Sequence, residues 1–235
     1  MHAVGMLSDF HHPAVAAKAK ELTEGKAKRL QKTEAIFHFV RDGIPFGFPS
    51  TWDELKASEV LECGFSYCNT KASLFLALCK AADVPARIHC GLIDLEIMRG
   101  IFPGFAFPFL PKAGSHSWID VEMDGEWKPI DSYINDKAFY ERALARLRKS
   151  GRPFGYSISF QDGKSSCEFN FGEKGFVHMG AVIEDHGTWD DLSQYIASDK
   201  YVRMNRMQLM LYPMMAAISN QTIARIREQV GEKAS

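Results

Sequence analysis

The stretch that decides the fold reads Gly64-Phe-Ser-Tyr-Cys68-Asn-Thr-Lys-Ala-Ser-Leu-Phe-Leu-Ala-Leu-Cys-Lys-Ala-Ala-Asp-Val-Pro-Ala-Arg-Ile-His-Cys-Gly91. A Gly/Ser turn is followed at once by Cys68 and by good helix formers. Apolar residues then recur at helical spacing, which predicts a helix buried on most of its sides. Asp83 and Pro85 end this helix, because the residue before a proline avoids the helical region. Residues 86–93 follow as a predicted short buried strand.

Cys68 therefore stands at the first turn of a buried helix. Unpaired backbone N–H groups and the helix dipole favour an anion there, so we expect a lowered thiol pKa and a nucleophilic sulfur. The alternative is a small buried apolar residue, which is how free cysteines are most often used. We assign that alternative to Cys79, Cys90 and Cys167. Residues further along the chain distinguish Cys68 from these three.

Residues 114–133 predict a β-hairpin, with Asp124-Gly125 as its turn. A two-residue turn pairs Trp118 with Asp131 and places His116 on the same face, one diagonal step away. Such diagonal neighbours are roughly 7–8 Å apart, so the carboxylate can hold the imidazole. A three-residue turn would send Asp131 to the opposite face. Asp120 or Glu122 would then have to orient His116.

A two-residue turn also predicts which side chains face the core. The other face of the hairpin carries apolar residues and should face the core; these residues are Ile119, Val121, Met123 and Ile130. His116, Trp118, Asp131 and Tyr133 should then face the start of the Cys68 helix. A thiolate, an imidazole and an orienting carboxylate are the nucleophile, base and orienter of acyl-transfer enzymes.

Ordered blocks of this sequence resemble the transglutaminase-like superfamily of cysteine enzymes. The blocks are Ala57-Ser-Glu-Val-Leu61, Gly64 to Cys68, Lys71-Ala72, Val84-Pro-Ala-Arg87, His116-Ser-Trp-Ile119 and Trp127-Lys-Pro-Ile-Asp131. Upstream, residues 39–44 resemble the helix that precedes the core in bacterial members. The resemblance covers roughly residues 30–135. One position departs from the family pattern, because Ser66 stands where a second glycine is usual.

The resemblance implies an α+β fold with a papain/transglutaminase-like core. The helix of the nucleophile would pack on an antiparallel sheet, and a helical C-terminal extension would follow. It also implies that Cys68, His116 and Asp131 are catalytic and act on amide or peptide bonds through a thioester. We expect hydrolysis, as by a peptidase or amidase. The alternatives are a protein-glutamine amine transferase and a non-catalytic binding module on the same fold.

Two related classes of enzyme do not fit the sequence. An arylamine acetyltransferase would need a turn similar to Arg-Gly-Gly-x-Cys. A peptide N-glycanase would be expected to carry paired Cys-x-x-Cys zinc ligands. Neither pattern occurs in this chain.

Four aromatic side chains are candidates for substrate binding. Trp52 precedes the nucleophile helix, and its indole N–H could be a second oxyanion donor, although a packed aromatic is the alternative. Residues 95–115 form a linker rich in phenylalanine and proline, which we interpret as a wall or lid of the cleft. Phe105 and Phe107 are its candidate contacts, unless the linker is a separate apolar cluster. Trp118 would line the site beside His116.

The composition limits the class of protein. Of 235 residues, 46% are hydrophobic and 24% charged, which is typical of a globular domain. The net charge of −1 predicts neither a nucleic-acid nor a membrane partner. Five cysteines without framework spacing argue against a disulfide scaffold and favour a reducing compartment. We expect no cofactor and no metal.

The termini complete the expected organisation. The N-terminus lacks the features of a signal peptide, and the apolar run 209–218 is too short to span a bilayer, so we expect a cytoplasmic protein. Residues 1–135 should form the catalytic core with its N-terminal helices. Residues 136–235 should be an extension packed on that core as part of one compact domain. Its methionines would serve core packing or, alternatively, a homo-oligomer interface.

The sequence predicts further elements on both sides of the Cys68 helix and the hairpin. Helices are expected at 13–25 and 26–40, a loop at 44–52, and then a short helix capped by Ser50 or Thr51 with Glu54. The extension should contain a helix from 136 to 149, a hairpin of 156–160 with 167–171, and a strand at 176–183. A capping box of Thr188 and Asp191 should open a short helix. Residues 199–230 should be helical, with a break at Pro213.

Overall fold

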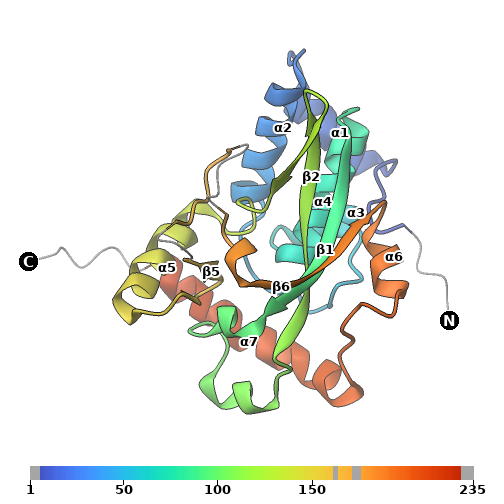
Figure 1. The fold of residues 1–235 in the computed structure, drawn as a ribbon. Helices are drawn as coiled ribbons and strands as arrows, with labels where there is room; N and C mark the ends of the chain where they lie inside the picture. Colours follow the sequence, from blue (N-terminus) through green and yellow to red (C-terminus); the bar gives the residue numbers. More distant parts are fainter. Residues whose placement is uncertain (1–5, 161–163, 171–175, 229–235) are drawn as a thin grey trace, which may run out of the picture.

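The computed structural model describes residues 6–160, 164–170 and 176–228. A four-stranded sheet in the order β3-β2-β1-β6 forms the centre, and all three of its strand pairs are antiparallel (Figure 1). The strands are β1 (Ala86–Asp94), β2 (Ala113–Met123), β3 (Glu126–Ile130) and β6 (Val182–Trp189). A two-stranded sheet is formed by β4 (Phe154–Gly155) and β5 (Ile158–Ser159). The helices are α1 (Pro13–Thr23), α2 (Arg29–His38), α3 (Ala57–Cys63), α4 (Cys68–Ala81), α5 (Lys137–Ser150), α6 (Leu192–Ala197) and α7 (Arg206–Glu228).

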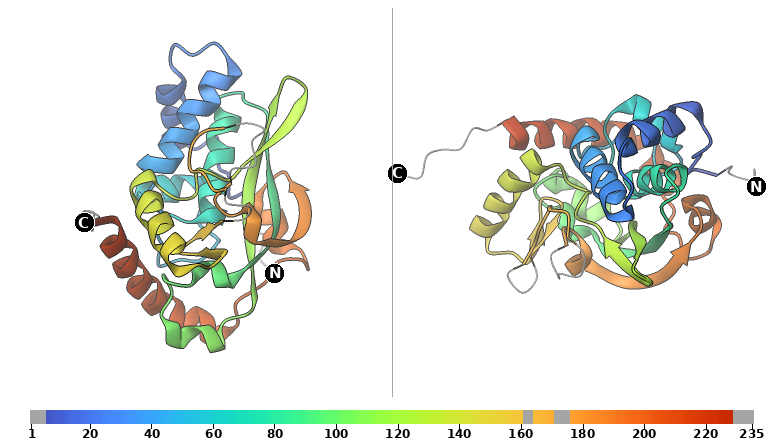
Figure 2. Two further views of the ribbon diagram at one scale, coloured as in Figure 1. Left: turned by 60° about the vertical axis from the view of Figure 1, so that its left-hand side comes forward. Right: turned by 90° about the horizontal axis from the view of Figure 1, so that it is seen from above.

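Helix α4 is the buried element on which the other parts pack. Every residue from Cys68 to Cys79 is buried. The helix packs on β1 and β2, while α1, α2 and α3 pack against it, so it has protein on all sides (Figure 2). The predicted helix, strand and α+β arrangement are therefore confirmed. Ser66 needs no glycine because its φ is not positive, and its hydroxyl bonds that of Thr70 in the first turn.

The hairpin has the predicted two-residue turn. Asp124 (φ 54°) and Gly125 (φ 84°) both adopt the left-handed conformation that this turn requires. Met123 pairs with Glu126, and the register continues to the pair Ile119–Ile130. The four apolar residues of one face are all buried in the core, as expected; they are Ile119, Val121, Met123 and Ile130.

The sheet is completed by β6, whose close approach requires a glycine. A Cβ atom at Gly91 would collide with the carbonyl oxygen of Glu184 on β6. Gly91 is also the partner of His116 in the pairing of β1 with β2. Gly91 thus lets β6 pack against β1 at the position where β1 pairs with His116 of β2.

The N-terminal part differs from the prediction at two places. The second helix is shorter than 26–40 and continues as a π-helical turn, Phe39–Gly43. The short helix starts at Ala57 instead of after Ser50 or Thr51. Its first turn is capped by the Glu59 carboxylate, which accepts the Lys56 N–H at 2.7 Å. The linker 95–115 is also more ordered than expected, because 3-10 helices span Leu95–Met98 and Gly104–Phe109.

In the C-terminal part, α5 has the predicted ends. Asp136 accepts the Phe139 N–H as N-cap, and Gly151 (φ 66°) terminates the helix. The predicted pairing of 156–160 with 167–171 is not formed, since β5 pairs with β4. Its turn at 161–163 and residue 171 lie outside the described residues.

The predicted strand at 176–183 is displaced along the chain. Residues Met179–Ala181 form a 3-10 turn and the strand is β6. The cap of α6 is Asp191, which accepts the Ser193 N–H, and Thr188 belongs to β6. Helix α7 contains Pro213 within its length and packs on α5. Residues 199–205 are not helical, and 229–230 lie outside the described range. The division at residue 135 stays a prediction.

Candidate functional site

Cys68 is the first residue of α4 and is only 7% exposed. Its thiol donates to the side-chain oxygen of Asn69, with a separation of 3.7 Å. The backbone N–H groups of Asn69 and Ser117 also face the sulfur. Burial nevertheless raises the pKa of the Cys68 thiol, and the nearby Asp53 carboxylate raises it further. The expectation of a lowered pKa is therefore wrong for this structure, because desolvation outweighs the helix end.

A buried carboxylate that the sequence pattern did not reveal organises the surroundings of Cys68. Asp53 is fully buried and accepts the hydroxyls of Tyr67 and Tyr201, each at 2.6 Å, and the amide of Asn69 at 2.8 Å. Burial is the main reason that its pKa is raised. Asn69 in turn accepts the Ser117 hydroxyl at 3.0 Å. The network thus ties the start of α4 to β2.

Trp52 belongs to the same network and is not free to bind an oxyanion. Its indole N–H donates to the Tyr201 hydroxyl at 2.9 Å. Its ring lies 5.4 Å from Tyr67 and 4.8 Å from Tyr212, which it meets edge to face. The packed-aromatic alternative is therefore the correct one here. Tyr201 and Tyr212 come from the C-terminal extension, so that extension covers the Cys68 network.

His116 is fully buried, and neither of its ring nitrogens has a hydrogen-bond partner among the described residues. Its ring lies 5.1 Å from His178 and 5.9 Å from Trp118. Burial, and then the neighbouring His178, hold the pKa of His116 well below its usual range. The imidazole is therefore neutral. His116 directly precedes Ser117, whose backbone N–H faces the Cys68 sulfur. The His116 imidazole itself makes no hydrogen bond to that sulfur.

Asp131 does not form the expected hydrogen bond with His116. Its carboxylate accepts three backbone N–H groups instead, from Val177 (2.9 Å), His178 (2.7 Å) and Met179 (2.9 Å). The hairpin register was correct, but this later segment returns over the same face and occupies the carboxylate. Burial raises the pKa of Asp131 to about 6 although the three N–H groups oppose that change.

His178 connects Asp131 to His116. Its Nε2 donates to the Ser157 carbonyl at 2.9 Å and lies 2.7 Å from the Ser157 hydroxyl. A carbonyl only accepts, so Nε2 carries the proton. Asp131 thus holds the backbone of the residue whose ring packs against His116. Sequence reasoning missed His178 because its predicted strand gave no signal of a return to the hairpin.

The other two candidate carboxylates, Asp120 and Glu122, form ion pairs with basic side chains other than His116. Asp120 lies 3.2 Å from Arg87 Nε and 3.1 Å from His89 Nδ1. Glu122 pairs with Arg29 near the hairpin turn. Trp118 is buried and stacks on His89 at 4.3 Å. These contacts leave neither carboxylate as an orienter of His116.

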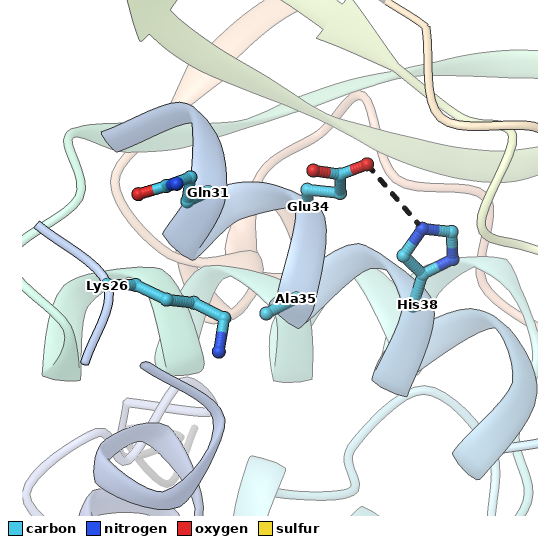
Figure 3. A pocket seen from close by; sticks show the side chains of 5 residues that line it. All are labelled: Lys26, Gln31, Glu34, Ala35 and His38. Carbon is cyan, nitrogen blue, oxygen red and sulfur yellow. Dashed lines mark ion pairs between the residues drawn. The ribbon is translucent and has the colours of Figure 1, made fainter. Parts of the chain in front are cut away.

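The remaining predicted contacts lie further out. Tyr133 is fully buried against Phe75 of α4, and burial and then the nearby Asp131 and Cys68 hold its pKa well above the usual range. Phe105 is 68% exposed, whereas Phe107 is half-buried and packs under Arg99 at 4.3 Å. A surface hollow beside α2 is lined by residues outside the Cys68 network; they are Lys26, Gln31, Glu34, Ala35 and His38 (Figure 3).

The described ranges contain neither a metal-ligand cluster nor a membrane-spanning helix. Within residues 6–160, 164–170 and 176–228, no three His, Cys, Asp or Glu side chains converge as they would around a metal ion. The helices in those ranges are all too short or too polar to cross a bilayer.

Comparison with known proteins identifies a family and two distant structures. The family described as the transglutaminase-like superfamily matches residues 16–132. A Cytophaga hutchinsonii protein, provisionally described as a cysteine protease, is 19% identical with a TM-score of 0.38, over 49% of this chain and 35% of that one. A Parabacteroides distasonis protein, provisionally described as a protease, is 14% identical with a TM-score of 0.38, over 53% of this chain and 24% of that one. No curated protein matches this chain significantly.

Proposed function

Because this chain belongs to the transglutaminase-like superfamily through residues 16–132, we propose that it is a cysteine acyl-transfer enzyme acting on amide or peptide bonds. Cys68 is the nucleophile, His116 the general base, and Asp131 the third member of the group. Hydrolysis is the reaction we favour. A protein-glutamine amine transferase differs only in the acceptor that resolves the thioester.

The observation that carries the proposal is the unpartnered imidazole of His116. A fully buried polar group without a hydrogen bond is destabilising and calls for an explanation. His116 lies next to Ser117, whose N–H faces the Cys68 sulfur. A base held beside a thiol until substrate arrives accounts for both facts.

The proposed reaction conserves every proton. His116 takes the thiol proton, and the Cys68 sulfur attacks the substrate carbonyl. The oxyanion that forms is stabilised by the Cys68 backbone N–H at the start of α4. When the C–N bond breaks, the leaving amine takes the proton from His116, and the acyl group stays as a thioester. Water then attacks the thioester, gives its proton to His116, and releases the carboxylic acid and the thiol.

In this proposal the described geometry is the closed resting state of the enzyme. The thiol and the imidazole are both neutral, because burial disfavours either charge. Tyr201 and Tyr212 cover the network around Cys68. Substrate therefore has to displace part of this cover before the sulfur can reach a carbonyl. Asp131 supports His116 through the segment 177–179 in this state.

One specific observation favours a second candidate, the non-catalytic binding module. Cys68 and His116 are not hydrogen-bonded to each other, and the Asp131 carboxylate accepts backbone N–H groups of residues 177–179 instead of an imidazole. The chain could thus keep the family fold, with Cys68, His116 and Asp131 at the three triad positions, and still have no catalytic turnover. This candidate predicts ligand binding that does not depend on the Cys68 sulfur.

Turnover of a peptide and amide library separates the candidates. Release of acid and amine in water alone, lost in Cys68→Ala and kept in Cys79→Ala, supports the hydrolase. Cys79 is a suitable control because it lies buried in the same helix. Product formation that requires an added amine identifies a transferase. No turnover with any substrate, together with binding that Cys68→Ala retains, would favour the binding module.

A further inference from the structure

Exposed apolar side chains are concentrated in two segments of this protein. Seven of the eleven large exposed apolar side chains in the described part of the chain lie within residues 105–109 and 207–214. The most exposed are Phe109 (76%), Met210 (72%) and Phe105 (68%). Single exposed apolar residues are ordinary, but gathered ones mark an interaction surface.

The two segments lie at the same end of the molecule. The Val202 N–H, just before α7, donates to the Ser115 hydroxyl at 2.8 Å, just after the phenylalanine-rich segment. Phe48 contacts a residue near each segment, because its ring packs on Phe102 and its N–H donates to Asn220 of α7. Figure 1 and the left view of Figure 2 show them together at the lower end of the ribbon. We call the exposed side chains of 105–109 and 207–214 the apolar end surface.

Helix α7 is apolar on two faces over its first half. Tyr212 and Ala216 are buried against the protein. An outward stripe repeats at helical spacing on the exposed side; its members are Met207, Met210, Leu211 and Met214. Packing within this chain therefore does not explain the outward stripe.

The charged side chains of the two stretches that carry the apolar end surface are all basic. Neither residues 97–119 nor residues 200–227 contain an aspartate or a glutamate. Four basic side chains of these stretches are exposed; they are Lys112, Lys200, Arg203 and Arg206. Within the ranges that the structure describes, none of the four forms an ion pair. The acidic residues that bring the net charge to −1 therefore lie elsewhere in the chain.

We propose that the apolar end surface docks on an anionic lipid membrane, with the protein lying on the bilayer. Phe109, Met210 and their neighbours enter the boundary between headgroups and acyl chains, and the basic side chains meet the lipid phosphates. A second copy of this chain fits less well, because a two-fold contact of this surface with itself would bring like charges together.

Vesicle sedimentation with the full chain tests the proposal. The wild type should bind vesicles of phosphatidylglycerol and phosphatidylcholine in equal amounts at least tenfold more tightly than phosphatidylcholine alone. Phe109→Ser/Met210→Ser should weaken that binding at least tenfold. Ile183→Ser is the matched control, because Ile183 is 59% exposed on β6, outside this surface, and its loss should change nothing.

A second pair of measurements keeps the test decisive if the serine variant does not fold. Arg203→Glu/Arg206→Glu should abolish binding to the anionic vesicles, and salt should weaken the wild type. Equal binding to both vesicle types, or none to the anionic ones, would overturn the proposal. So would light scattering that shows a wild-type dimer which Phe109→Ser/Met210→Ser converts to a monomer.

Discussion

At the scale of single residues, one sulfur and one imidazole define the candidate site. Both are buried and both are neutral, so the resting protein does not contain the ion pair that a sequence motif suggests. Burial moves the pKa of the thiol up and that of the imidazole down, and each change removes a charge. Reactivity must therefore appear when substrate binds or when the cover opens.

Cys68→Ala should abolish turnover, because it removes the proposed nucleophile. The fold should persist, since alanine is a good helix former and the removed atom is small. Cys63, five residues earlier, is partly exposed and serves as the internal control for labelling. Mass spectrometry after iodoacetamide treatment should show Cys63 modified before Cys68 in the resting wild type. Full activity in Cys68→Ala would refute the assignment of the nucleophile.

His116 and Asp131 should contribute unequally to catalysis. His116→Ala removes the only proton acceptor proposed for the thiol, so turnover should fall to near zero. Asp131→Asn keeps a side-chain oxygen for the segment 177–179 but removes the charge, so residual activity should remain. Steady-state kinetics over a range of pH measures both variants. Wild-type rates in Asp131→Asn at every pH would exclude any role for Asp131.

At the scale of elements, the C-terminal extension acts on the site that the first half of the chain builds. Residues 199–216 bring Tyr201 and Tyr212 onto Trp52 and Asp53. These contacts join segments far apart in the chain, as the Tyr201–Asp53 separation of 148 positions shows. The extension therefore contributes contacts to the surroundings of the candidate site.

Tyr201→Phe should loosen this cover. The substitution removes the hydroxyl that bonds Asp53 and accepts the Trp52 indole, which costs about 1–3 kcal/mol when buried partners are left unpaired. The cover should then open roughly tenfold more often, since 1.4 kcal/mol is about a factor of ten. Labelling of Cys68 should accelerate by a similar factor, while Tyr140→Phe on α5 changes nothing. Unchanged labelling in Tyr201→Phe would show that access to Cys68 does not depend on this contact.

At the scale of the whole molecule, the buried histidines predict how stability depends on pH. Burial lowers the pKa of His178 to about 3, so it stays neutral in the folded protein while the unfolded chain gains its proton below about 6.5. Stability from His178 is therefore complete above that pH and is lost as pH falls. The loss amounts to about 2 kcal/mol between pH 8 and pH 5. Asp131 opposes it by about 1.4 kcal/mol, because its raised pKa favours the protonated folded form.

His178→Gln tests this dependence by removing one of the groups. Urea unfolding at pH 8 and pH 5 should show a fall in unfolding free energy that is smaller by about 2 kcal/mol in the variant than in the wild type. His38→Gln is the control, because His38 is exposed at the end of α2. An equal fall in His178→Gln and wild type would mean that His178 is already charged in the folded protein.

Whole-molecule charge does not by itself exclude the membrane contact proposed above. A net charge of −1 predicts no membrane binding, but that sum averages over the entire surface. Folding brings two stretches without acidic residues to one end of the molecule. The charged residues of these two stretches are all basic although the net charge of the chain is −1.

The sequence by itself determined the Cys68 helix, the strand after it and the register of the hairpin. These features depend on local rules: helical and strand periodicity, a proline boundary, and an Asp-Gly turn that permits positive φ at both positions. The face of His116 and the burial of Ile119 and Val121 followed from the same two-residue period.

Only the tertiary structure decided what each site residue contacts. Asp131 was placed on the right face, yet three N–H groups from residues 177–179 occupy it. Asp53 gained Tyr201 as a partner across 148 positions, and Trp52 lost its free N–H to the same hydroxyl. Burial then reversed the expected pKa change of Cys68. Hydrogen-bond partners and desolvation depend on which distant segments return to a site, and no local pattern carries that information.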